Sequence, residues 1–189
     1  MIEMKNVAIF AGYDVLAFQS RDHIQYIKSA FQWAVKIGVG YIILIGGATN
    51  PHYLTLTEAE ANKMIMDTCL SKTGLQPKII VLPVGNTATE GLLAAKNWII
   101  ENLKSVNILL LCGEQSRIVN FQMDALQIGL LDLSETIMAY GHHFPESKEN
   151  FSQERRKAKL HCFSHLHWFW KKIRLILQKR HQKKMARRK

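Results

Sequence analysis

The sequence predicts a Rossmann-like three-layer α/β/α fold with a mostly parallel sheet of about five strands. Two observations lead to this prediction. Short apolar runs of strand length alternate along the chain with longer segments in which apolar residues recur at helical spacing. The runs are apolar at consecutive positions, which is typical of strands that right-handed β–α–β crossovers cover on both faces. With 189 residues, the chain is long enough for one domain with a substantial core.

The first predicted strand is Val7–Ala11, and the helix expected after it spans about residues 22–37. In that helix Ile24, Ile27 and Phe31 recur at helical spacing and share one apolar face. The other expected elements are a strand at Tyr41–Ile45, a helix at 57–72, a strand at Ile79–Val84, a helix at 88–104, a strand at Ile108–Cys112, a helix at 116–128 and a less regular strand at Thr136–Tyr140.

Thr57 is expected to begin the second helix as its N-cap. Glu60 follows three residues later, which is the spacing of a capping box. In that motif each side chain accepts a hydrogen bond from the backbone N–H of the other residue. This local signal predicts one helix start independently of the apolar pattern.

Charge divides the chain near residue 150. Residues 151–189 hold 14 Lys and Arg and a single acid, Glu154, whereas residues 1–150 hold 11 Lys and Arg against 14 Asp and Glu. The formal net charge of +10 therefore comes from the last segment alone. We expect a Rossmann-like domain over residues 1–150 and a basic amphipathic helix and tail over residues 151–189.

The apolar and aromatic residues of that tail recur at helical spacing. Three interpretations remain open: the apolar face packs on the domain, residues 166–189 bind an anionic membrane surface, or their charge attracts nucleic acid, which is the least favoured. The residues of the predicted face are Leu166, Phe169, Trp170, Ile173 and Leu177.

Cysteine use and hydropathy favour a cytoplasmic location. Cys69, Cys112 and Cys162 are widely spaced and odd in number, which does not indicate a disulfide framework. No stretch approaches the roughly 18 apolar residues of a membrane span, and the first apolar run is too short for a signal peptide. We expect a cytoplasmic protein, peripheral at the inner membrane face if its tail binds lipid.

No motif identifies a reaction. The metal-like cluster "HCFSHLH" (161–167) lacks a fourth ligand, so no metal site is expected. The double glycine after the second strand does not run into a helix as G-x-G-x-x-G, and no G-K-[ST] occurs, which argues against a standard dinucleotide or ATP site. Ser116 has no G-x-S-x-G motif around it, which argues against a serine hydrolase. The catalytic residues, and whether the chain is an enzyme, stay open.

Small and polar residues follow each predicted strand. In parallel α/β folds ligands bind outside the carboxyl ends of the strands, and glycine allows a ligand to approach the backbone amides. The alternative is that the glycines only make tight turns, and Asn86 and Thr87 are equally suited to cap the third helix. The candidate ligand-binding residues are Gly12, Asp14, Gly46, Gly47, Thr49, Glu58, Asn86, Thr87, Gly113, Glu114 and Arg117.

The charged candidates suggest particular roles. The carboxylates of Asp14, Glu58 and Glu114 are suited to ribose hydroxyls, a metal or general-base chemistry. Glu58 can equally be a helix N-terminal acid that the macrodipole favours. Arg117 opens the fourth helix, where anions normally bind, so it either shares an anionic ligand with the helix amides or forms a surface ion pair.

Between residues 5 and 130 the chain contains, in this order, "VAIFAG", Arg21 ahead of a helix, "IILIGG", "LTEAEANKM", "IIVLPVGNTATEGLLAAK" and "ILLLCGEQSR". In the order and spacing of these motifs it resembles the domain-of-unknown-function family that contains YdcF, SanA and ElyC. The chain departs from the family pattern at Ile45, where Ser is usual, and at Cys112-Gly113, where Thr-Ser is usual. The best-matched positions are Gly46, Gly47, Glu58, Asn86, Thr87 and Arg117.

The resemblance implies a Rossmann-like fold and, for YdcF-like members, binding of S-adenosylmethionine with no established reaction. It implies a nucleotide-like or phosphate-bearing small ligand, with S-adenosylmethionine as the candidate cofactor. The alternative is an envelope-linked interaction protein with a degenerate pocket, which its basic tail holds at the inner membrane face.

Overall fold

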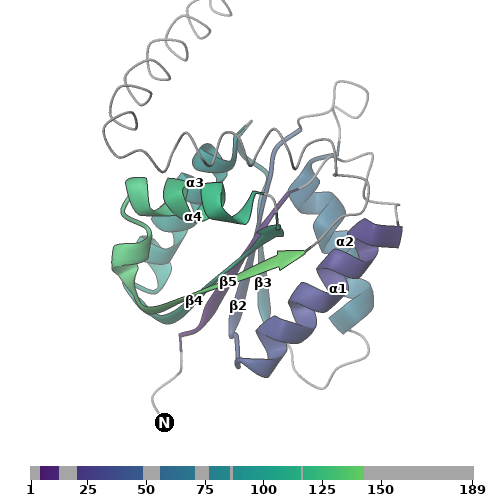
Figure 1. Cartoon of the computed structure of the whole chain (residues 1–189), viewed down its shortest axis with the longest axis horizontal. Coiled ribbons are helices and arrows are strands. Elements are labelled where there is room, and N and C mark those ends of the chain that lie inside the picture. The colour runs from purple at the N-terminus through teal and green to yellow at the C-terminus, as the bar shows by residue number, and fades with distance from the viewer. Residues whose placement is uncertain are drawn as a thin grey trace, which may run out of the picture. The chain divides into compact units, whose positions relative to one another are not determined.

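A computed structural model of the chain describes residues 5–12, 21–48, 56–70, 77–85, 87–115 and 117–142 (Figure 1). In these residues five parallel strands form one sheet in the order β3-β2-β1-β4-β5. The elements are β1 (Val7–Ala11), α1 (Arg21–Lys36), β2 (Tyr41–Ile45), α2 (Glu58–Leu70), β3 (Lys78–Leu82), α3 (Ala88–Asn102), β4 (Val106–Glu114), α4 (Ile118–Gln127), the short 3₁₀ helix η2 (Leu131–Leu133) and β5 (Ser134–His142).

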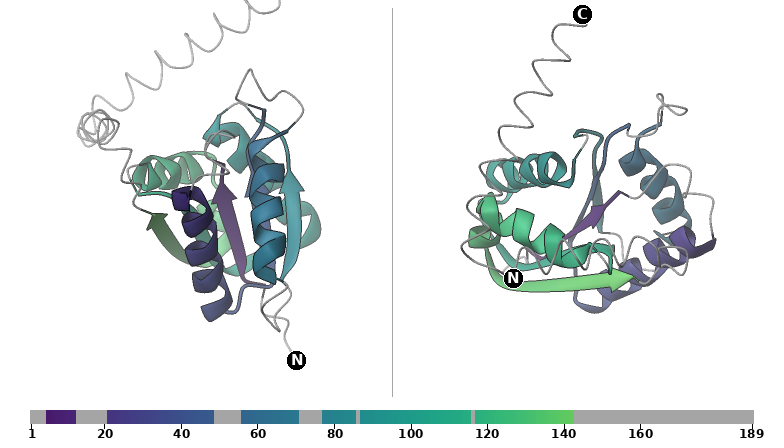
Figure 2. Two further views of the ribbon diagram at one scale, coloured as in Figure 1. Left: turned by 90° about the vertical axis from the view of Figure 1, so that its right-hand side faces the viewer. Right: turned by 45° about the horizontal axis from the view of Figure 1, so that its top comes forward.

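Helices cover both faces of the sheet. Figure 1 shows α1 and α2 on one side and α3 and α4 on the other, and the turned views of Figure 2 agree. Along β1, Ala8 and Phe10 belong to the core cluster under α1 and α2, whereas Val7 and Ile9 belong to the cluster under α3 and α4. None of these four side chains is exposed. Burial on both faces is why the run is apolar at consecutive positions, and the predicted Rossmann-like architecture is confirmed.

The strand ends differ in part from the prediction. β1 and β2 have the predicted bounds, whereas β3 ends at Leu82, directly before Pro83, which has no N–H to donate to a sheet. β4 and β5 are longer than predicted because they pair with each other from Val106 to Glu114. Gly113 and Glu114, which the sequence placed in a loop, are therefore the last two residues of β4.

The capping box at the start of α2 is confirmed. Glu60 accepts a hydrogen bond from the Thr57 backbone N–H at 2.9 Å, and the Thr57 hydroxyl accepts one from the Glu60 N–H at 3.2 Å. The backbone N–H and the hydroxyl of Thr57 lower the pKa of the Glu60 carboxyl. The reciprocal bonds satisfy donors that the first turn of a helix leaves without intrahelical partners.

The strand order places a topological switch point between β1 and β4. From β1 the chain proceeds through α1, β2 and α2 to β3, and α3 then returns it to the other side of β1, where β4 pairs. Crossovers on opposite faces leave the carboxyl ends of β1 and β4 without a shared covering helix. In open parallel sheets this is where ligands bind.

The five-stranded unit belongs to residues Met1–Glu146 and is described by itself. The expectations for residues 151–189, including the amphipathic helix, the membrane and nucleic-acid partners and the cluster at 161–167, lie outside the described residues. Within the described part of the chain, no helix combines the length and the apolar character needed to cross a membrane.

Candidate functional site

The candidate residues divide into three groups at the carboxyl ends of the strands. Gly12, Gly46, Gly47 and Glu58 meet near the ends of β1 and β2, and Thr87 begins α3. Gly113, Glu114 and Arg117 lie at the end of β4 and the start of α4. Asp14, Thr49 and Asn86 lie outside the described residues.

The glycines after β1 and β2 leave room for the side chain of Glu58. A Cβ on Gly12 would collide with the Glu58 carboxylate and lie 2.6 Å from the Glu58 Cβ. A Cβ on Gly46 would lie 2.8 Å from the same Glu58 atom, and Gly46 has a φ of +142°, which side chains with a Cβ rarely adopt. Packing inside the protein therefore already requires both glycines.

The double glycine also holds the first turn of α2. The N–H of Glu58 donates to the carbonyl of Gly47 at 3.1 Å, and the N–H of Ala59 donates to the carbonyl of Gly46 at 3.3 Å. Amides at a helix start are the groups that bind phosphate in many nucleotide sites. At α2 these two amides already have acceptors, and the glycines present carbonyls to the helix.

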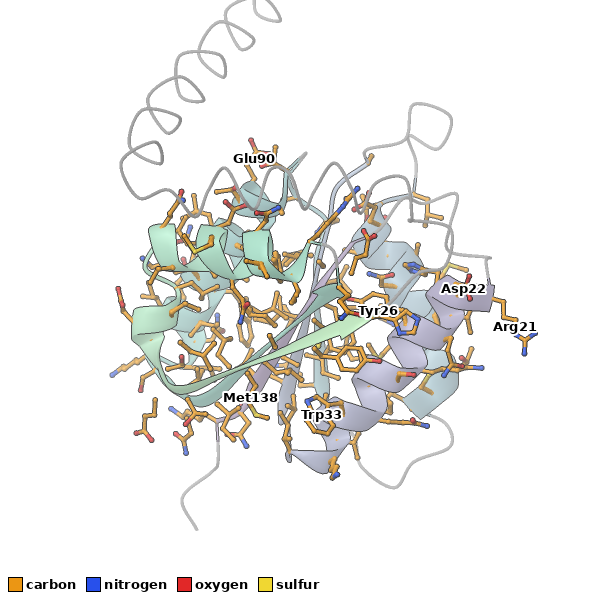
Figure 3. All side chains as sticks on the ribbon, viewed as in Figure 1. Arg21, Asp22, Tyr26, Trp33, Glu90 and Met138 are labelled. Atoms are coloured by element: carbon orange, nitrogen blue, oxygen red, sulfur yellow. The ribbon has the colours of Figure 1, made fainter. Side chains whose placement is uncertain are left out.

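Thr87 is the N-cap of α3. Its backbone is extended, and its hydroxyl accepts a hydrogen bond from the Glu90 N–H at 3.2 Å. This is one of the two roles that the sequence suggested for Thr87. Figure 3 shows the Glu90 side chain at the edge of the molecule, directed away from the sheet.

Glu114 is a buried carboxylate at the end of β4. Its side chain is only 2% exposed, and neither carboxylate oxygen accepts a hydrogen bond from any residue that the structure describes. The Arg117 Nε lies 3.2 Å from Glu114 Oε2, which makes an ion pair, although the pair lacks hydrogen-bond alignment. Burying a carboxylate is unfavourable unless charge and hydrogen bonds compensate it. Glu114 is therefore only partly compensated.

Arg117 stands on the solvent side of this pair. Its side chain is 55% exposed, and it occupies the N-cap position of α4 without a side-chain cap bond. The structure shows an ion pair, which was one of the two roles expected for Arg117. Its partner is a buried acid, so the pair differs from an ordinary surface salt bridge.

A polar network below the end of β1 was missed in the sequence. His23 on α1 and Asn62 on α2, each about 1% exposed, are joined by a 2.7 Å bond between His23 Nε2 and Asn62 Oδ1. Asn62 Nδ2 in turn donates to the carbonyl of Ala11 at 3.5 Å, and the Tyr26 hydroxyl donates to the same carbonyl at 3.4 Å. Since an amide oxygen only accepts, His23 Nε2 carries the proton. His23 precedes Tyr26 by three residues and Ile27 by four, which places it on the buried face of α1. This spacing was the sequence signal that could have identified His23.

The surroundings of this network keep its groups neutral. Burial lowers the pKa of His23, the hydrogen bond that His23 donates to Asn62 opposes that effect, and nearby His142 lowers the pKa further. Burial also raises the pKa of Tyr26 and of Cys112 well above their ordinary values. Tyr26 lies on the side of α1 that faces the sheet (Figure 3).

His142 ends β5 and joins this group of rings. Its ring centroid is 5.8 Å from that of Tyr26 and 6.4 Å from that of Tyr140, on which it stacks. The strand expected at Thr136–Tyr140 stopped two residues short of His142, and the pairing of His142 with Glu114 explains the longer strand. Among the described residues, no three His, Cys, Asp or Glu side chains are arranged to hold a metal ion.

Comparison with known proteins adds no relative to this description. No family model, no curated protein and no solved structure matches the chain. The resemblance to the YdcF, SanA and ElyC family therefore stays a prediction.

The two kinds of glycine can be separated by mutation. We expect Gly46→Ala to lower the free energy of unfolding by about 1–3 kcal/mol, because it adds strain at positive φ and crowds Glu58. Gly113→Ala is the matched control, since its Cβ would meet Ile118 at an ordinary 3.6 Å. Urea unfolding of both variants measures the difference. Equal stability of the two would contradict the role assigned to Glu58.

His23 predicts a pH dependence of stability. Its pKa in the folded protein lies below the value of 6.5 expected in the unfolded chain, so the unfolded chain binds the proton more readily. The contribution of neutral His23 is complete above pH 6.5 and is lost as the pH falls toward the lower, folded-state pKa. His23→Gln should therefore flatten the loss of unfolding free energy between neutral and mildly acidic pH. Parallel curves for the two proteins, measured by urea unfolding across that range, would refute this account.

Proposed function

We propose that the chain binds a small, nucleoside-type ligand at the carboxyl ends of β1 and β4, and that S-adenosylmethionine is the candidate ligand. The buried, partly compensated carboxylate of Glu114 is the observation that supports this proposal. It lies at the topological switch point of the sheet, where parallel α/β folds place their ligands.

The chemistry of Glu114 favours a ligand that donates hydrogen bonds. A carboxylate whose oxygens accept no hydrogen bond from the described residues can accept the paired hydroxyls of a ribose or face a positive charge. A buried acid with so few partners adds little to stability, so a role in binding explains its presence better than a role in folding. S-adenosylmethionine fits both possibilities, because it carries ribose hydroxyls and a positively charged sulfonium.

A phosphate-bearing ligand is a weaker fit to the described residues. The first amides of α2 donate to Gly46 and Gly47, and the amide of Glu90 donates to Thr87. These amides would have to exchange partners before they could hold a phosphate. We therefore favour the nucleoside part of the ligand class over its phosphate-bearing part.

Calorimetry and thermal shift test this proposal directly. S-adenosylmethionine and adenosine should stabilise the protein saturably, whereas ribose 5-phosphate should not. Glu114→Gln should weaken binding of the nucleoside by about tenfold or more, since a hydrogen bond to a charged group contributes roughly 1.5–3 kcal/mol. Glu135→Gln, at an exposed position of β5, is the matched control and should bind normally. Equal affinity of all three proteins would sink the proposal, as would no saturable shift with any nucleoside.

The charge of the tail supports a second candidate function, attachment to an anionic membrane surface. Residues 151–189 carry 14 Lys and Arg and one acid, and apolar residues recur among them at helical spacing. Clusters of basic residues beside an apolar helical face are typical of segments that bind anionic lipid. This would make the chain an envelope-linked interaction protein at the inner membrane face.

Truncation of the tail tests this candidate, and vesicle and nucleic-acid binding of the intact chain distinguish the two partners. Cutting after Leu177 removes seven of the fourteen basic residues, and each contributes on the order of 1 kcal/mol near an anionic surface. Co-sedimentation with anionic vesicles should therefore fall steeply, and neutral vesicles serve as the control. Absence of lipid-dependent binding by the intact chain would refute the membrane candidate. Salt-sensitive binding to RNA or DNA alone would replace it with the nucleic-acid alternative.

A further inference from the structure

The ion pair between Arg117 and Glu114 joins two side chains in very different surroundings. The carboxylate is 2% exposed, whereas the guanidinium side chain that meets it is 55% exposed. The cation is therefore the solvent-accessible member of the pair, and the acid is the buried one. The contact with Arg117 thus shows that this carboxylate can be paired with a guanidinium group.

The contact itself leaves part of the binding capacity of Glu114 unused. Arg117 approaches through Nε, at 3.2 Å from Oε2, and no hydrogen bond to either carboxylate oxygen results. A guanidinium that is free to orient binds a carboxylate through two parallel N–H···O bonds, which are stronger and more specific. A cation brought in by a ligand can make the two-bond contact that Arg117, tied to the start of α4, does not make here.

Aromatic rings flank the same part of the sheet. Side chains alternate along a strand, so Glu114 points to the same face of β4 as Cys112, which packs in the cluster under α1 and α2. His142 is the register partner of Glu114 on β5, and the rings of Tyr26 and Tyr140 lie beside His142. Aromatic faces next to a carboxylate favour organic cations over small hydrated ions.

We propose that Glu114 is a subsite for a positively charged organic group, a guanidinium or a primary ammonium, and that Arg117 occupies this subsite in the absence of ligand. The ligand's cation binds Glu114 in exchange for Arg117, which swings out into solvent. The inference rests on the proposed function only in placing the ligand at this end of the sheet. It adds that Glu114 also accepts a positively charged group, beyond the ribose hydroxyls considered above.

Chemical rescue of Arg117→Ala tests the subsite with methylguanidinium as the probe. Removing the arginine leaves a buried carboxylate without its cation, so the variant should melt below the wild-type protein. Millimolar methylguanidinium should restore stability saturably, while equal concentrations of urea or sodium chloride should not. In calorimetry the variant should bind the probe at least about tenfold more tightly than the wild-type protein, which must first expel Arg117.

Two further variants make the test independent of folding defects. Arg117→Ser places a good N-cap residue at the start of α4 while still removing the guanidinium, and it should bind the probe as Arg117→Ala does. The double variant Arg117→Ala with Glu114→Gln should show no saturable response, because the carboxylate is gone.

Each outcome decides the inference. Saturable, Glu114-dependent binding of methylguanidinium to either single variant supports it. No such binding, or binding that survives in the double variant, overturns it. Failure here is distinguishable from failure of the proposed function, which depends on nucleoside binding by the wild-type protein. Nucleoside binding without rescue would leave that function standing and remove only the cation subsite.

Discussion

The pairing of β1 with both β2 and β4 is the constraint on which the rest of the structure depends. A strand hydrogen-bonded on both edges and covered on both faces has no room for polar side chains, and residues 7–10 have none and are completely buried. The same pairing forces the chain to return across the sheet through α3 before β4 can form. The switch point, and with it the place of Glu114 beside the end of β1, follows from this one position in the sheet.

Buried polar groups near that point have different kinds of partner. His23 Nε2 donates to Asn62 Oδ1, and Asn62 Nδ2 and the Tyr26 hydroxyl both donate to the carbonyl of Ala11. This network ties α1 and α2 to the last residue of β1, so it has a structural explanation that needs no ligand. Glu114 is equally buried, but its compensation among the described residues is one imperfect ion pair.

Local patterns predicted most of the fold, because the signals that determine it are local. Consecutive apolar residues gave β1 and β2 their correct bounds, and the spacing of Thr57 and Glu60 identified the start of α2. The ends of β4 and β5 could not be predicted in the same way. Gly113 and Glu114 have weak strand propensity, and they become strand residues only because β5 pairs with them.

Predicting the candidate site from the sequence was harder. A glycine indicates that a Cβ would be crowded at that position, but it does not indicate which group lies there. The double glycine suggested a ligand above the backbone, whereas the structure fills the space beside Gly46 with the Glu58 side chain. That residue stands more than ten positions along the chain, and its contact with Gly12 depends on the sheet order. Glu114 and Arg117 were identified as candidates, but only the three-dimensional structure shows that the acid is buried and the cation is not.

The groups at the carboxyl ends of the strands differ between the two sides of β1. On the β2 side, Glu58 packs against Gly12 and Gly46, and the first amides of α2 are bonded, so a ligand would have to displace parts of the core arrangement. On the β4 side, the described group that meets the buried carboxylate is an arginine side chain that is 55% exposed. The poorly aligned ion pair with Arg117 compensates the buried carboxylate only in part, whereas a well-oriented cation would stabilise it more. This difference is why the proposed ligand site lies on the β4 side, where binding would exchange Arg117 for a group of the ligand.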